Sequence, residues 1–450
     1  MKTSSTQQPS MTNEGPVKKH LKLITTTYQN NSKSDYTEKI EELFKNFNYN
    51  HNKNQYWSEP EQSMLFGSPL YEAASPAQRL ALNHLNWFAS YNYISNSETE
   101  TVTLNQVTAG VFSAIGGGYE TVAKELAMET EQEHIHIKAF RKIGLMTAIA
   151  LIGKEELNSS LKWNSYKLSL GNDVIPTSKY YALRFLAKSM LNRTNQHYSP
   201  YLNELEKQNN FVFKIPTIGI VGRSLKHSLE NFFTFNWGGG SPFLACQFYT
   251  VRMIANLHLK NMEHPMTKFF KKLEKNGESI PAPTAVSHYH FLDESFHTTT
   301  SHVLAKDMYK DFPKPTAYEK YIGNLAIYLL QRGALGGLSA ILPHRYFTDD
   351  YVLMEIVYRL LQAPLFGMSA SEALECMYQC FCCEHEGFHV AFRNRQRLLL
   401  ELRRFFEDID YLLPVNREMR VMASRGSISD AIQSNIKTFK KFSNLVASLH

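Results

Sequence analysis

The stretch HFLDESFH, residues 290–297, places three candidate metal ligands on one face of a helix. His290, Glu294 and His297 stand at positions i, i+4 and i+7, and residues at this spacing point the same way on an α-helix. Imidazole and carboxylate groups are both common ligands of transition metals. The stretch therefore predicts a helix that contributes to a metal site.

The unit Glu-x-x-His at the end of this stretch occurs elsewhere in the chain. In di-iron and dimanganese carboxylate proteins, two helices of a bundle each donate this unit and two others each donate one Glu. Two copies overlap within residues 131–136, and we favour Glu133/His136 because apolar residues continue its stripe along the helix. The four copies are Glu131/His134, Glu133/His136, Glu294/His297 and Glu386/His389.

Each unit also has an upstream Glu at a distance that suits a helical hairpin. Two antiparallel helices, each about fifteen residues long from site to turn, bring together residues about thirty positions apart. Three hairpins follow: Glu263 precedes Glu294 by 31 residues, Glu355 precedes Glu386 by 31, and Glu98 and Glu100 precede Glu133 by 35 and 33. The sequence leaves open whether Glu98 or Glu100 is the ligand.

Two pairings of these hairpins can form a dimetal site. We favour the first, because His290 adds an imidazole to it and residues 378–392 resemble an ordinary buried helix with a Cys-rich face. Its ligands are Glu98 or Glu100, Glu133, His136, Glu263, His290, Glu294 and His297. The rival set is Glu263, Glu294, His297, Glu355, Glu386 and His389.

This ligand pattern resembles the AurF-type p-aminobenzoate N-oxygenases, which are ferritin-like dimetal oxygenases. The resemblance covers roughly residues 80–305, and Gln132 stands where that family usually has Asp. The matching positions are Glu98 or Glu100 on the first helix, Glu133 and His136 on the second, Glu263 on the third, and His290, Asp293, Glu294 and His297 on the fourth.

Length and a long insertion after His136 make the chain more similar to the CylC-like dimetal halogenases of cyanobacteria. This resemblance implies chlorination of an unactivated carbon of a fatty acyl group on an acyl carrier protein, in natural-product biosynthesis. It also implies two iron ions, with manganese or a mixed pair as the alternative, and O₂, chloride and an external reductant such as a ferredoxin. The alternatives are a dimetal N-oxygenase or hydroxylase without halide, and a non-catalytic metal-binding or structural helical protein.

The whole chain shows helical periodicity, interrupted by Gly- and Pro-rich turns. We predict an all-α fold, a ferritin-like four-helix dimetal-carboxylate bundle with additional helices. Pro265 is expected to kink or end the third helix. The predicted organisation is a disordered lead at 1–40, a bundle at 41–310 with an insertion at about 140–240, and a C-terminal helical region at 311–450.

Composition limits the classes of function. The 450 residues are 43% hydrophobic with a net charge of +6, which is typical of a globular protein. No apolar run is long enough for a membrane span, and no basic stretch has the interleaved aromatics of a nucleic-acid site. Four of the five Cys cluster at 376–383, an arrangement that favours a reducing cytoplasm over a disulfide framework.

Overall fold

A computed structural model describes residues 18–157, 182, 185–187, 189–191, 198–207 and 237–448. Within these ranges all regular structure is helical, which confirms the all-α class. No helix in the described part of the chain has the length and apolar character needed to cross a bilayer. The helices are α1 (Lys19–Asn31), α2 (Tyr36–Lys45), α3 (Tyr49–Asn52), η1 (Pro60–Gln62), α4 (Pro69–Ala73), α5 (Pro76–Ile115), α6 (Glu120–Ile152), α9 (Pro200–Lys207), α11 (Pro242–Lys275), α12 (Ala282–Lys306), η3 (Met308–Asp311), α13 (Ala317–Gly333), α14 (Tyr351–Gln362), α15 (Ala370–Cys382), α16 (Glu386–Phe406), α17 (Pro414–Arg417), α18 (Arg420–Ala423) and α19 (Ile428–Ala447).

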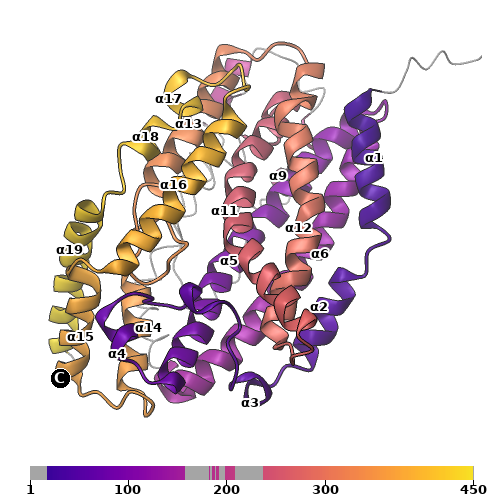
Figure 1. Cartoon of the computed structure of the whole chain (residues 1–450). Helices are drawn as coiled ribbons and strands as arrows, with labels where there is room; N and C mark the ends of the chain where they lie inside the picture. The colour runs from indigo at the N-terminus through magenta and orange to yellow at the C-terminus, as the bar shows by residue number, and fades with distance from the viewer. Residues whose placement is uncertain are drawn as a thin grey trace, which may run out of the picture.

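Four long helices, α5, α6, α11 and α12, lie side by side as two hairpins (Figure 1). A capping box of Ser75 and Gln78 begins α5. The turn to α6 contains Gly116–Gly118, all with positive φ, a conformation that other residues rarely adopt. Between these boundaries α5 and α6 pack against each other as a hairpin, as the sequence predicts.

The second hairpin joins α11 to α12 through the turn at Gly277, whose φ is +68°. Of the two outcomes predicted for Pro265, the structure excludes an end of the helix, since α11 continues to Lys275. Met262, Glu263 and Met266 are all buried around this proline. Their packing compensates for the backbone hydrogen bond that proline cannot donate.

Two short helices near the N-terminus cover the long ones. The predicted disordered lead is wrong from residue 18 onward, because α1 packs on α6 and α12, and α2 packs on the same two helices. Leu21 and Ile24 are buried, and their burial contributes about 1.5–3 kcal/mol each. The polar composition of this segment conceals the helix, because Thr27 and Asn31 complete its buried face.

The C-terminal helices form a second layer beside the bundle (Figure 1). α13 and α16 pack on α11, α14 contacts α6, and α15 packs against α19. The helix expected over residues 378–392 is divided, since α15 ends at Cys382 and α16 begins at Glu386. Most of the predicted insertion lies outside the described residues, and the boundaries between the bundle and its neighbours stay a prediction.

Candidate metal centre

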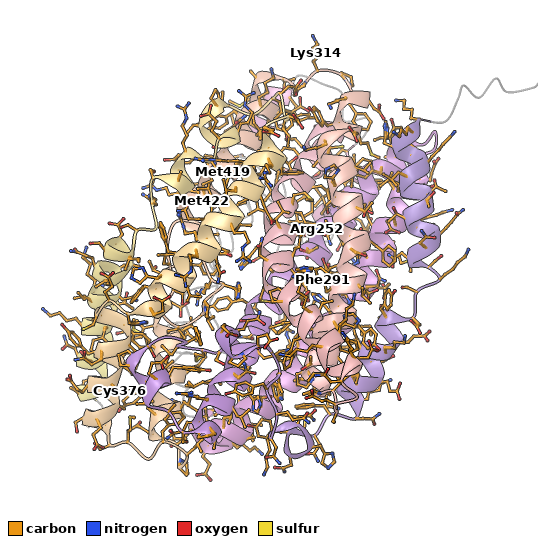
Figure 2. All side chains as sticks on the ribbon, in the orientation of Figure 1. Arg252, Phe291, Lys314, Cys376, Met419 and Met422 are labelled. Atoms are coloured by element: carbon orange, nitrogen blue, oxygen red, sulfur yellow. The ribbon has the colours of Figure 1, made fainter. Side chains whose placement is uncertain are left out.

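Most of the predicted ligand residues converge between the four long helices. The side chains come from α5, α6, α11 and α12, and each residue is less than a tenth exposed. Glu100 is the exception, because it is only half-buried and lies outside the group. Figure 2 places Arg252 and Phe291, which neighbour this cluster, near the middle of the molecule. The residues that converge are Glu98, Glu133, His136, Glu263, His290, Glu294 and His297.

The cluster contains two groups of ligand atoms, and the atoms of each group lie within 4.8 Å of one another. Glu294 belongs to both groups. Two ions that share a carboxylate are typical of dimetal sites, in which the metals lie close together. The first group is Glu98, His136, His290 and Glu294, and the second is Glu133, Glu294 and His297.

The inner ring nitrogens face carboxylate oxygens. His297 Nδ1 lies 2.7 Å from Glu294 Oε1 and 3.5 Å from Glu133 Oε1. His290 Nε2 lies 3.0 Å from Glu98 Oε1 and 3.7 Å from Glu294 Oε1. His136 Nδ1 lies 3.4 Å from Glu133 Oε2. All three imidazoles therefore present a nitrogen to the same small volume.

The outer ring nitrogens are held by other side chains. His136 Nε2 pairs with Asp293 Oδ2 at 3.2 Å, and His297 Nε2 pairs with Gln132 Oε1 at 3.0 Å. Partners of this kind fix the orientation of a ligand imidazole and strengthen its metal binding. Gln132, the departure from the AurF pattern, thus keeps a hydrogen bond to a cluster histidine.

The support continues into α1 and α2. Gln132 Nε2 donates to Asn31 Oδ1 at 2.7 Å and to Asp293 Oδ1 at 3.4 Å. Thr37 Oγ1 donates to Asp293 Oδ2 at 3.0 Å. Sequence reasoning missed Asn31 and Thr37, since no local pattern connects them with residues about 100 or more positions away.

Glu263 contacts the cluster from its edge. Its Oε1 accepts hydrogen bonds from Tyr91 Oη at 2.6 Å and from His290 Nδ1 at 2.7 Å. Its Oε2 is buried and has no hydrogen-bond partner among the described residues, and the same holds for Oε2 of Glu98. Buried carboxylate oxygens normally have partners. These two free oxygens fit the donor set that a metal ion requires.

A buried arginine adjoins the second group. Arg252 Nη2 donates to Glu133 Oε1 at 3.1 Å, and its Nη1 donates to Glu129 Oε2 at 2.5 Å and to Asn105 Oδ1 at 3.3 Å. Sequence analysis did not single out Arg252. The available signal was the series Glu125, Glu129 and Glu133 on one face of α6, since buried carboxylates need a cationic partner.

Protonated imidazoles balance the carboxylates of the metal-free chain. Burial and the neighbouring His290 would lower the pKa of His136, but hydrogen bonds to Asp293 and Glu133 raise it to about 9. Burial would likewise lower the pKa of His290, but Glu263 and Glu98 raise it well above its usual value. Burial, with the charge of Glu133, raises the pKa of Glu98 to about 7.

Metal binding is therefore expected to release protons. An imidazole with a raised pKa is protonated at neutral pH and must lose that proton to bind a metal. The affinity should fall as the pH drops below the pKa of about 9 of His136. Titration with Fe²⁺ under anaerobic conditions at about pH 6 and pH 8 measures this difference. Equal affinities at the two pH values would contradict the assignment of these imidazoles as ligands.

Replacing Gln132 by Leu should weaken metal binding by about 10- to 100-fold, because it removes the partner of His297 Nε2. Gln331 offers a matched control, since it is also buried but hydrogen-bonds with Asn416. Gln331→Leu should leave the metal affinity unchanged. Anaerobic Fe²⁺ titration of both variants makes the comparison, and equal affinities would rule out the positioning role of Gln132.

The structure also separates the alternatives that the sequence left open. Glu131 and His134 are both exposed, on the other face of α6. Glu386 is exposed and pairs with Arg393, and half-buried His389 pairs with Glu384, whereas Glu355 is buried against Arg359. The rival ligand set is therefore not brought together.

The fold and the cluster define a helical protein with a buried site, rich in carboxylates and histidines, that is suited to two metal ions. Over residues 19–443 the chain matches the family described as acyl halogenase CylC-like, and it belongs to that family. The resemblance found from the sequence is thereby confirmed. No curated protein and no solved structure matches the chain.

Proposed function

We propose that this chain is a dimetal, O₂-dependent enzyme that chlorinates an unactivated carbon of a fatty acyl group on a carrier protein. The observation that carries the proposal is the pair of buried ligand groups sharing Glu294, in a member of the acyl halogenase family. Mixed carboxylate and imidazole ligands favour iron or manganese, and we propose two iron ions. A manganese or mixed pair suits the same donors.

Six residues would hold the metals. A redox-active metal pair supplies the oxidation of the C–H bond with O₂, while the protein supplies ligands, access and a dry pocket. Glu263, Asp293 and Gln132 each hold one ring nitrogen, so that the three cluster imidazoles keep their orientation. The proposed ligands are Glu98, Glu133, His136, His290, Glu294 and His297, with Glu263 at the edge of the set.

The overall reaction also defines the co-substrates. A C–H bond, chloride, O₂, two electrons and three protons give a C–Cl bond and two molecules of water. The two electrons require an external donor, for which a ferredoxin is the class we propose. Burial of the cluster excludes bulk water, which would otherwise compete with chloride.

The test is a single incubation of the chain with iron, a reductant, O₂ and an acyl group bound to a carrier protein. Chloride is replaced by bromide in a parallel reaction, and the acyl product is analysed by mass spectrometry. We expect the isotope pattern of whichever halogen is present. The expected product requires C–H cleavage and halide transfer at one site, which is the chemistry that distinguishes a halogenase.

The matched control is Glu386→Ala, which leaves the cluster intact and should halogenate like the unaltered chain. A product that gains one oxygen regardless of the halide would move the assignment to a hydroxylase or N-oxygenase. Unmodified substrate together with a chain that binds no metal would instead favour a structural role.

A further inference from the structure

A row of aromatic rings leads from α3 to the edge of the ligand cluster. The distances between ring centroids are 6.0 Å from Tyr49 to Trp57, 6.1 Å from Trp57 to Trp87, and 4.3 Å from Trp87 to Tyr91. Tyr91 lies 6.3 Å from the ring of His290. Trp57, Trp87 and Tyr91 are fully buried, and Tyr49 is half-buried. The row therefore connects the neighbourhood of the surface with the candidate metal centre.

Indole and phenol rings are the side chains that most readily lose a single electron. The rate of electron transfer falls exponentially with separation, so rings at near contact exchange electrons much faster than one long transfer across the same span. A packed core also contains neighbouring aromatics. The spacing of the rings therefore fits both an electron path and ordinary core packing, and the hydrogen bonds at each end of the row distinguish the two.

Both tyrosines of the row have a proton acceptor. Tyr91 Oη lies 2.6 Å from Glu263 Oε1, and Tyr49 Oη lies 3.1 Å from His84 Nδ1. His84 Nε2 lies 2.7 Å from the carbonyl oxygen of Gln55 and donates to it, so Nδ1 accepts the proton of Tyr49. A tyrosine gives up an electron easily only when its hydroxyl proton leaves with it. A base at each end meets this requirement.

We infer that Tyr49, Trp57, Trp87 and Tyr91 form a path for single electrons between α3 and the metal centre. The inference rests on the proposed function, because the oxidant is the one that a metal pair generates from O₂. Tyr91 gives an electron to that oxidant and its hydroxyl proton to Glu263 Oε1, and becomes a neutral radical. Trp87, Trp57 and then Tyr49 each return one electron, and the Tyr49 proton passes to His84. An external one-electron donor reduces Tyr49, and the two protons return along the same hydrogen bonds.

The first test uses the metal-free chain, so that it does not depend on the proposed function. A ruthenium photo-oxidant is attached to Asn50→Cys, at an exposed residue beside Tyr49, in a Cys376→Ala/Cys383→Ala background. A flash with a diffusible electron acceptor oxidises the ruthenium, and transient absorption follows tryptophan and tyrosine radicals. The component lost in Tyr91→Phe is the Tyr91 radical. We expect Trp87→Phe to abolish that component and Trp87→Tyr to restore it.

Two controls accompany this test. Tyr249→Phe removes another buried tyrosine, which hydrogen-bonds with Thr108 outside the row, and should change nothing. Attaching the label at Lys314→Cys places it at the opposite end of the molecule from α3 (Figures 1 and 2) and should yield no Tyr91 radical. A Tyr91 radical that survives in Trp87→Phe, or that forms equally from both labels, would overturn the path. Equal midpoints of thermal unfolding for Trp87→Phe and Trp87→Tyr would exclude misfolding as the cause of a difference in their Tyr91 radical.

The second test uses the iron-loaded chain without acyl substrate. The sample is mixed with O₂ and frozen rapidly, and electron paramagnetic resonance should then detect a radical signal. This signal should narrow when the chain is labelled with ring-deuterated tyrosine, and it should be absent in Tyr91→Phe. Trp87→Phe should prolong the lifetime of this radical, because residue 87 then no longer returns an electron to Tyr91. An iron-loaded chain that consumes O₂ without this signal contradicts the path. A chain that binds no iron contradicts the proposed function, whereas the flash experiment still decides the path.

Discussion

Glu294→Ala is expected to leave the chain with almost no bound metal. Glu294 is the only residue shared by both ligand groups of the described residues, so its loss removes a ligand from each. Its Oε1 also lies 2.7 Å from His297 Nδ1 and 3.7 Å from His290 Nε2. The unaltered chain should approach two metal ions per molecule after reconstitution with Fe²⁺. Plasma mass spectrometry of the desalted protein gives the metal content.

Glu386→Ala is the matched control for this measurement. Glu386 begins the last Glu-x-x-His unit but is exposed and pairs with Arg393 at 2.8 Å. Its replacement should leave the metal content unchanged. Circular dichroism should show similar helical content in both variants, because one substituted residue leaves almost all of the helical hydrogen bonds in place. Normal metal content in Glu294→Ala would exclude the dimetal assignment, and loss of metal in both variants would restore the rival pairing, which also contains Glu294.

Much of the bundle could be predicted because its signals are local. Proline and glycine residues mark the starts of the four long helices, and hydrophobic periodicity fills the intervals. These residues are Pro76, Gly116–Gly118, Gly238–Pro242, Pro281 and Pro283. The Glu-x-x-His units also depend only on the helical repeat. Fold class and most of the converging residues therefore follow from short-range spacing.

To choose between Glu98 and Glu100, one must know how α5 is oriented about its own axis. Residues two positions apart point to nearly opposite sides of a helix, and both sides of α5 are partly buried here. The structure places Glu98 beside His290 and leaves Glu100 outside the group. Only the packing of α5 on its neighbours fixes this rotation, and spacing along the chain does not encode it.

The side chains that support the ligand cluster from α1 and α2 could not be predicted from the sequence for a related reason. Asn31 and Thr37 lie in a polar segment and are ordered by contacts with Gln132 and Asp293. Such contacts need polar groups that pair in three dimensions, whereas hydrophobic patterns register only apolar faces. Burial of a polar residue depends on a partner that the local sequence does not reveal.

Arg252→Met should destabilise the metal-free chain by about 3–5 kcal/mol, because it leaves buried carboxylates without their cationic partner. Arg252 lies between Glu129 and Glu133, and all three side chains are less than a tenth exposed. Urea denaturation followed by circular dichroism measures the free energy of unfolding. Arg420→Met is the control, since Arg420 pairs with Glu418 on the surface and its loss should be undetectable.

A double variant identifies the origin of that loss. Glu129 lies outside both ligand groups, so Glu129→Gln can neutralise its charge without removing a candidate metal ligand. If an unpaired buried charge causes the destabilisation, Arg252→Met/Glu129→Gln should be more stable than Arg252→Met alone, with a coupling of about 0.5–3 kcal/mol. Additive effects of the two substitutions would assign the loss to the packing of the arginine stem instead. Since Arg252 also donates to Glu133 at 3.1 Å, the arginine whose ion pair this cycle tests is in contact with a candidate metal ligand before any metal binds.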